Sequence, residues 1–321
     1  GIEIPDSALI VLLQETKFKL YYNTLLHSLK EYRRVVQMVR PIASNLLKPH
    51  LDNLEFSLRP GMVSLTWTSM NIDVYIQQVW TELSKLEQLV RSVNDVMETR
   101  VDGNLKQVSR VLLIDLPDEA DGPVSLEDFV DIQERHVREM TGILVSKSQE
   151  IEMAVNDMLG IIVEYPLDSH VRGVSESEII KVKAHYNWSM YQALLTSTKR
   201  SLSYLKKRLS VRDNNGSPFF EVDVQLDGQD VRVRPTIDDL QQAVSGGAQA
   251  ILKCSKMIEA WDTVTIPKNV QLILNPNLPP VLGTGSQGTF YDRVAQDKEI
   301  LKVILLLTGS IQSTREAVED H

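Results

Sequence analysis

The chain has 321 residues, of which 43% are hydrophobic and 24% charged, and its formal net charge is −9 at pH 7. This composition suits a globular protein with a buried core, and the negative charge argues against nucleic acid as the main partner. Cys254 is the only cysteine, which excludes an intrachain disulfide and a cysteine-based metal site and indicates the cytosol. No apolar run reaches the roughly 18 residues that a membrane span needs. Both ends of the sequence have helix-like patterns, and we expect a piece of a longer protein.

Residues 6–39 predict a long helix that Arg40-Pro41 breaks or bends. Its apolar stripe consists of Leu9, Leu12, Leu13, Thr16, Leu20, Leu25, Leu29 and Tyr32. Residues 42–57 predict a shorter helix that is interrupted near Pro49. The dipeptide Pro60-Gly61 is typical of a turn, and Ser69 is a candidate N-cap for the helix that follows.

The segment 58–113 contains a heptad seam, and the rest of the fold is expected to be organised around it. Its apolar residues alternate at spacings of four and three, which only a helix places on one face. They are Ile72, Ile76, Val79, Leu83, Leu86, Val90, Val93 and Met97. The register shifts after Met97 and resumes through Val101, Leu105, Val108 and Leu112. Such a helix would be roughly 60 Å long, and its single apolar stripe requires neighbouring helices, so we expect an elongated bundle.

Two further helices follow, separated by loops at 114–124 and 164–174. Ser125 with Asp128 resembles a capping box for the first, which ends near Val163. His136 lies on its apolar stripe and is interpreted as a hydrogen-bonded core or boundary residue, because no second His or Cys stands at metal spacing.

The second of these helices, 176–211, has Ser175 and Glu178 as a possible cap and ends in a cluster of cations. These are Lys199, Arg200, Lys206, Lys207, Arg208 and Arg212. Cations at this end complement the helix dipole. The alternative is a docking patch for an acidic partner such as a calmodulin-like light chain.

Residues 219–234 switch to an alternating pattern and predict a β-hairpin with Asp227-Gly228 as its loop. In that register Val224 faces Val231 and Val222 faces Val233, so one face is apolar. Because two strands alone are marginally stable, this face is expected to lie on a helix bundle or on another strand.

The C-terminal region predicts two helices separated by an irregular linker, 263–289. Thr236 and Asp239 form a capping box for the helix 237–261, in which Gly246-Gly247 indicates close packing or a bend. Cys254 on this helix is interpreted as a small core residue. The last helix, 291–319, has an apolar stripe of Val294, Ile300, Leu301, Ile304, Leu305 and Ile311.

The search for chemistry yields one formal motif, Gly-x-Gly-x-x-Gly at 283–288. A dinucleotide site needs a strand before this motif, and the preceding NPNLPPVL cannot be a central strand, so we interpret it as a linker. The carboxylate pairs Glu176/Glu178 and Asp238/Asp239 stand at helix starts, where they suit the dipole. Asn187-Trp188-Ser189 matches a glycosylation acceptor but is placed within a helix. We therefore assign no catalytic, cofactor-binding or metal residue and expect no enzyme in this segment.

The sequence thus predicts an all-α fold of elongated tandem helical bundles, with coiled-coil-like long helices and one β-hairpin at about 219–234. We divide it into four regions. They are a bundle with the heptad helix at 1–113, a two-helix extension at 114–212, the hairpin insertion at 213–236, and a second bundle at 237–321 that includes the linker.

Several motifs, in this order, resemble the stem (tail) region of dynein heavy chains. They are Leu58-Arg59-Pro60-Gly61, Leu65-Thr66-Trp67-Thr68-Ser69, Asn71-Ile72, Val93-Asn94-Asp95-Val96, Arg100-Val101-Asp102, Leu116-Pro117, Pro218-Phe219, Pro235-Thr236, Trp261 and Tyr291 through Arg315. The pattern is most similar to axonemal outer-arm chains of the gamma type and extends over nearly the whole chain. The linker 263–289 departs from the family in being short and rich in proline and glycine. The relatives vary widely in this stretch, and we assign no function to it.

The resemblance implies a parent chain that is an ATP-driven microtubule motor of cilia and flagella, with ATP and magnesium bound outside this segment. It implies that the segment binds WD-repeat intermediate chains, light chains, neighbouring heavy-chain stems and a docking complex, with microtubules reached indirectly. Nucleic acid and membrane are not expected partners. The expected location is the cytoplasm, the cytoskeleton and the axoneme. The alternative is a helical rod of a cytosolic tethering or cytoskeletal scaffold complex without a motor, and an enzyme that uses the glycine motif ranks third.

Overall fold

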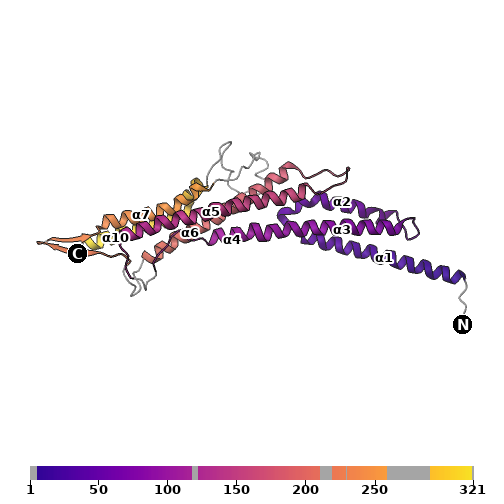
Figure 1. Ribbon diagram of the computed structural model, residues 1–321, viewed down its shortest axis with the longest axis horizontal. Helices are drawn as coiled ribbons and strands as arrows, with labels where there is room; N and C mark the ends of the chain where they lie inside the picture. The colour runs from indigo at the N-terminus through magenta and orange to yellow at the C-terminus, as the bar shows by residue number, and fades with distance from the viewer. Residues whose placement is uncertain (1–5, 118–121, 210–218, 229, 259–289, 320–321) are drawn as a thin grey trace, which may run out of the picture. The chain divides into compact units, whose positions relative to one another are not determined.

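A computed structural model of the chain describes residues 6–117, 122–209, 219–228, 230–258 and 290–319. In these residues the regular elements of secondary structure are helices apart from one two-stranded antiparallel sheet. This confirms the predicted all-α class with a hairpin (Figure 1). Two compact units divide the chain: Gly1–Arg100 with Ala154–Val182, and Val101–Met153 with Lys183–His321. The predicted four regions, which follow sequence order, remain an interpretation of the sequence.

The first unit is built on three helices: α1 (Asp6–Met38), α2 (Ser44–Val63) and α3 (Ile72–Asp95). Both α1 and α2 pack along α3 (Figure 1). Arg40 has an extended backbone, and the short 3-10 helix η1 (Pro41–Ala43) follows it. The break predicted at Arg40-Pro41 is therefore confirmed.

The heptad seam forms the buried face of α3, as predicted. Val79, Leu83, Leu86, Val90, Val93 and Met97 are each at most 3% exposed. Ile72 and Ile76, at the start of the helix, are half-buried. Burial of one large aliphatic side chain contributes about 1.5–3 kcal/mol, so this stripe is a main source of stability for the first unit.

The register shift predicted after Met97 corresponds to a π-helical segment, η2 (Val96–Asp102), which leads into α4 (Gly103–Arg110). A π turn holds more residues than an α turn and therefore rotates the following side chains about the helix axis. As a result Val101 and Val108 are fully buried, although the strict heptad spacing has ended.

The turn predicted at Pro60-Gly61 and the interruption predicted at Pro49 are wrong, because both prolines lie inside α2. A proline removes a helical hydrogen bond and displaces the preceding turn. The Tyr75 hydroxyl of α3 compensates: it accepts from the Gly61 N–H at 2.9 Å and lies 3.0 and 3.1 Å from the Ser57 and Leu58 carbonyl oxygens. A Cβ on Gly61 would come within 2.6 Å of the Tyr75 hydroxyl, so only glycine fits there.

Ser69 does not cap α3, which corrects the predicted N-cap. Its hydroxyl instead accepts from the Thr66 N–H at 2.9 Å within the connection between α2 and α3. The helix begins at Ile72 after Asn71, which has a left-handed backbone with φ of +60°. Asparagine tolerates this conformation better than most residues, and the chain reverses there without a side-chain cap.

The second unit contains most of α5 (Leu126–Val163) and α6 (Glu176–Leu209). A non-helical segment at 111–117 precedes α5, and side chains of both helices bind its backbone. Ser201 Oγ accepts from the Leu113 N–H at 2.8 Å, and the Ser197 hydroxyl donates to the Val111 carbonyl at 2.9 Å. Buried backbone groups need such partners, and these hydroxyls explain how the segment lies in the core.

The remaining helices of this unit are α7 (Ile237–Lys253), the 3-10 helix η4 (Cys254–Met257), α9 (Tyr291–Ala295) and α10 (Lys298–Glu319). The capping box of Thr236 and Asp239 is confirmed in both directions. The single helix predicted at 291–319 is wrong. It is interrupted between α9 and α10, where Asp297 Oδ1 accepts from the Glu299 and Ile300 N–H groups and so caps α10.

The hairpin consists of β1 (Asp223–Asp227) and β2 (Asp230–Arg234), but its predicted register is wrong. Val224 pairs with Val233 and Leu226 with Val231, so Gly228, with φ of +72°, is the first loop residue. Because side chains alternate with a period of two, this shift keeps the same residues on each face. Val224 and Leu226 are 65% and 81% exposed, and the expected cover of the apolar face is therefore also wrong for these residues.

Leu86→Asp tests the burial of the heptad seam. The substitution places an unpaired charge in the core of the first unit, and we expect the free energy of unfolding to fall by about 3–5 kcal/mol. Urea denaturation followed by circular dichroism measures it. Lys85→Asp, on the exposed side of the same turn, is the control and should change stability by less than about 0.5 kcal/mol. Equal effects of the two variants would contradict burial of Leu86.

Tyr75→Phe tests the hydroxyl that satisfies α2 around Pro60. Removal of the oxygen leaves the Gly61 N–H and the Ser57 carbonyl without their partner, and we expect a loss of about 1–3 kcal/mol in unfolding free energy. Tyr22→Phe, at an exposed position of α1, should be neutral within about 0.5 kcal/mol. The same denaturation experiment compares them, and a neutral Tyr75→Phe variant would show that water replaces the hydroxyl.

Candidate docking surfaces

The first half of α1 carries part of the predicted apolar stripe, yet its apolar side chains are exposed. Six large apolar side chains of this half, on more than one side of the helix, have exposures between 42% and 63% and are together called the α1 apolar face: Ile10, Val11, Leu12, Leu13, Phe18 and Leu20. The Thr16 and Thr24 hydroxyls donate to the Leu12 and Leu20 carbonyls of the same helix at 2.8 and 2.7 Å. Contiguous exposed apolar surface of this kind marks interaction sites.

The connection between α2 and α3 continues this exposed surface. Trp67 packs edge-on against Phe18 of α1, with ring centroids 4.9 Å apart. Met62, Val63 and Val74 are also exposed, and Met70 is 91% exposed. The motif Leu65-Thr66-Trp67-Thr68-Ser69, on which part of the family resemblance rests, therefore lies beside the α1 apolar face.

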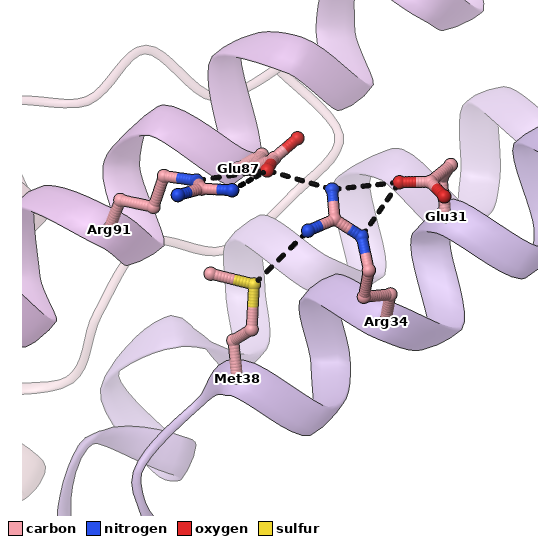
Figure 2. A network of polar contacts seen from close by, with 5 residues as sticks. All are labelled: Glu31, Arg34, Met38, Glu87 and Arg91. Atoms are coloured by element: carbon pink, nitrogen blue, oxygen red, sulfur yellow. Dashed lines mark hydrogen bonds and ion pairs between the residues drawn. The ribbon is translucent and has the colours of Figure 1, made fainter.

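The other half of α1 is fixed to α3 by an ionic network (Figure 2). Arg34 binds Glu31 on its own helix and Glu87 on α3 at 2.7 and 2.8 Å, and Arg91 binds the same Glu87 oxygen at 2.7 Å. Hydrogen bonds from Arg91 and Arg34 hold the pKa of Glu87 below its usual range. Asn94, also on α3, donates to the Met38 carbonyl at the end of α1 at 2.8 Å. This bond satisfies one of the carbonyl groups that a helix end leaves unpaired.

Joining the two halves of α1, Tyr21 donates to the Gly61 carbonyl at 2.7 Å. This bond lies next to the Tyr75 hydroxyl and ties α1 to the last turn of α2. Residues 10–20 are all exposed, whereas Ser28 and Val35, further along the helix, are buried. The α1 apolar face is thus presented by a helix that is anchored from Tyr21 onward.

The basic end of α6 is only partly a solvated surface. Lys199 forms ion pairs with Asp297, at 3.6 Å, and with Glu299, and Arg200 donates to the Ser109 carbonyl at 3.3 Å. Lys206 and Lys207 remain in the last turn, where they suit the dipole. Arg212 lies outside the described residues. Whether this end also binds an acidic partner stays a prediction.

Arg208 differs from the other cations of this cluster, because its side chain is buried. It is 8% exposed, its guanidinium nitrogens have no hydrogen-bond partner among the described residues, and its guanidinium carbon lies 5.2 Å from the Phe219 ring centroid. A cation over an aromatic face gains about 2 kcal/mol when desolvated. No local pattern indicated this contact, because the position of the Phe219 ring beside Arg208 depends on the fold.

The residues considered for chemistry are not brought together. His136 Nε2 lies 2.9 Å from the Leu112 carbonyl, which confirms its predicted hydrogen bond. Glu176/Glu178 and Asp238/Asp239 begin α6 and α7, and Asn187 lies within α6. The glycine motif at 283–288, most of the linker and Trp261 fall outside the described residues. Among the described side chains, no group of three or more His, Cys, Asp or Glu could hold a metal ion.

Two buried groups, Cys254 and His50, have shifted proton affinities for the same reason, the loss of solvation. Burial raises the pKa of the Cys254 thiol to about 12, so it is a thiol at neutral pH, in accord with its predicted core position. Burial lowers the pKa of His50. His50 Nε2 lies 3.0 Å from the Ile162 carbonyl.

Comparison with known proteins identifies the family. A family model described as "Dynein heavy chain, N-terminal region 1" matches residues 1–75. Over its whole length the chain is 34% identical to the dynein gamma chain, flagellar outer arm, of Chlamydomonas reinhardtii, and it covers 7% of that relative. The chain belongs to the axonemal dynein heavy chains. It is also 26% identical over 99% of its length to dynein axonemal heavy chain 8 of Homo sapiens, of which it covers 8%.

These matches confirm the resemblance predicted from the motifs, including its similarity to the outer-arm gamma type. The chain spans less than a tenth of the length of these dynein heavy chains. The relatives are flagellar or axonemal by name, which supports the predicted location in the cytoskeleton of a cilium or flagellum. In the part of this dynein segment that the structure describes, no helix is long and apolar enough to cross a membrane.

His50→Gln tests the buried histidine. Because burial lowers the folded pKa of His50 below its ordinary value of 6.5, the unfolded state binds a proton first as the pH falls. The stability contributed by neutral His50 is complete above about pH 6.5 and is lost as the pH falls below it. We expect the loss of unfolding free energy between pH 7.5 and 5.5 to be smaller in His50→Gln than in the parent chain. Urea denaturation at both pH values measures this, with His27→Gln, at an exposed position, as the control. Identical losses in the parent chain and in His50→Gln would contradict it.

Proposed function

We propose that the chain is a structural stem segment of an axonemal outer-arm dynein heavy chain. It scaffolds intermediate chains, light chains and neighbouring heavy-chain stems. In this proposal the ATP-driven motor lies elsewhere in the parent chain, binds ATP and magnesium there, and moves along microtubules during ciliary and flagellar beating. The segment itself carries load and subunits and catalyses no reaction.

The observation that carries the proposal is the α1 apolar face together with its support. A helix with exposed apolar side chains over residues 10–20 is marginal on its own in water. Here it is anchored from Tyr21 onward by the Gly61 bond and by the Arg34–Glu87 network. A stem that assembles with other subunits needs this combination of an anchored helix and uncovered apolar surface.

The relatives add a second support. The names of two relatives assign one to the flagellar outer arm and the other to the flagellar inner arm I1 complex. Both relatives match this chain over its full length. A segment that they share is suited to a role that they have in common, which we propose is assembly with other subunits. The names do not distinguish which subunit binds which face.

The experiment introduces Leu13→Glu with Leu20→Glu into the parent heavy chain in a flagellated cell. Charges on the α1 apolar face oppose burial against a partner, and we expect incorporation of the heavy chain into isolated axonemes, and its co-purification with intermediate chains, to fall at least tenfold. Gln14→Glu with Asn23→Glu adds the same charge at exposed polar positions of α1 and serves as the control.

Circular dichroism of the purified 321-residue chain checks that both double variants keep their helix content. Normal incorporation and co-purification of the Leu13→Glu, Leu20→Glu chain would contradict a docking role for this face. Recovery of the unaltered chain in a cytosolic tethering complex, and not in axonemes, would contradict the stem assignment itself.

A further inference from the structure

A groove lies between α5 and α7 in the second unit, with a volume of about 430 Å³. On the α7 side its lining includes Ala243, Gly246, Gly247 and Ala250. These positions recur at helical spacing and lie on one face of α7, where the longer side chains of Asp239 and Gln242 also line the groove. From α5, Leu126, Phe129 and Val130 line the opposite wall.

The two glycines of this face differ in what they meet. A Cβ on Gly247 would contact the Phe129 ring at 3.9 Å, an ordinary packing distance. A Cβ on Gly246 would meet nothing within 4 Å, and Gly246 is exposed. Glycine in a helix interior costs about 1 kcal/mol relative to alanine, and no contact within the described chain requires it at Gly246. The close packing predicted for Gly246-Gly247 is thus not found at Gly246, and Gly247 has only an ordinary contact with Phe129.

The groove is negatively charged along its rim. Glu134 and Asp239 line it, and none of the described residues that line it is Lys, Arg or His. The neighbouring first turns of α5 and α7 also carry Glu127, Asp128 and Asp238. The dipole of each helix is equivalent to about +0.5 elementary charge at its N-terminus. The negative charge of these acidic side chains is therefore larger than the positive charge of the two helix N-termini. Hydrogen bonds from Thr236 lower the pKa of Asp239, which keeps its carboxylate ionised.

The shape of the groove favours a helix over a compact ligand. Its lining on α7 extends from Asp239 to Ala250, which corresponds to about 16 Å along the helix axis. A bound helix anchors side chains at intervals of three and four residues over a similar length. Small residues on the receiving helix let the partner approach closely, and the half-buried Leu126 and Val130 of α5 provide apolar surface for its side chains.

We infer that the α5–α7 groove docks a basic amphipathic helix of a partner subunit, with its apolar side chains over Gly246 and its cations against Glu134 and Asp239. This inference rests on the proposed function, because it gives the chemistry of one partner that the stem would hold. It concerns a different surface from the α1 apolar face and is tested separately.

The test measures binding of a labelled synthetic helix to the 321-residue chain by fluorescence anisotropy. The probe is a Leu/Lys peptide of about three heptads, with leucine at the a and d positions, and a Leu/Glu peptide of the same pattern is the charge control. Gly246→Leu fills the groove while raising helix propensity, so the variant should fold. Gly142→Leu makes the same change on α5, at a glycine that also meets nothing within 4 Å and does not line the groove.

We expect Gly246→Leu to raise the Kd of the Leu/Lys peptide at least tenfold and Gly142→Leu to change it less than twofold. Glu134→Lys should raise the Kd at least fivefold, and Glu139→Lys, an exposed position of α5 outside the groove, less than twofold. The Leu/Glu peptide should not bind. Equal effects at the paired positions, or equal binding of the two peptides, would overturn the inference.

Sedimentation of the chain without peptide tests a second copy as the occupant. Self-association that Gly246→Leu abolishes would overturn the inference, because the groove would then hold another copy of this chain. The proposed function remains open to its own test in either case, since the Leu13→Glu, Leu20→Glu experiment leaves this groove unchanged.

Discussion

Burial of the apolar seam on α3 is the interaction on which the first unit depends. A helix with one apolar stripe is stable only when other helices cover that stripe, and α1 and α2 both pack along α3. The side chains from Val79 to Met97 are almost fully removed from water, whereas those at the start of the helix are half-buried. Beyond Tyr21, toward the N-terminus, α1 has no such cover within the described chain, and its apolar side chains remain exposed. The same requirement that produces the core thus produces the surface to which we assign docking.

A second constraint is that backbone N–H and C=O groups need hydrogen-bond partners where the helices are irregular. Side-chain hydroxyls provide these partners. Tyr75 occupies the gap that Pro60 makes in α2, and Ser197 and Ser201 bind the non-helical segment that precedes α5. Each unpaired buried backbone group would cost about 1–3 kcal/mol. These few polar contacts therefore allow a mostly apolar interior to include a proline-containing helix and a connecting segment, and they also fix which residues of neighbouring helices meet.

The sequence was sufficient for features that depend on local spacing and insufficient for those that depend on distant contacts. The seam from Ile72 to Met97, the shift that follows it and the capping box at Thr236 are set by residues within a few turns, and all three were predicted. Pro60-Gly61 was predicted as a turn because the compensating Tyr75 lies on another helix. The hairpin register was wrong because both registers place the same valines on one face. For the docking surfaces, the pattern identified the apolar residues of α1 but not which of them the fold would leave uncovered.

The π-helical segment between Val96 and Asp102 has a consequence for changes in chain length. It adds about one residue relative to regular α-helix, and this addition brings Val101 and Val108 onto the buried side. Deletion of one residue there would restore regular α-helix and keep the phase of the later side chains, whereas the same deletion within a regular turn of α3 would turn every later side chain by about 100° and direct polar residues inward. Single-residue insertions and deletions in the regular turns between Val79 and Asp95 therefore need a compensating change. An insertion of a whole heptad, which adds two near-integral turns, preserves the phase of the seam.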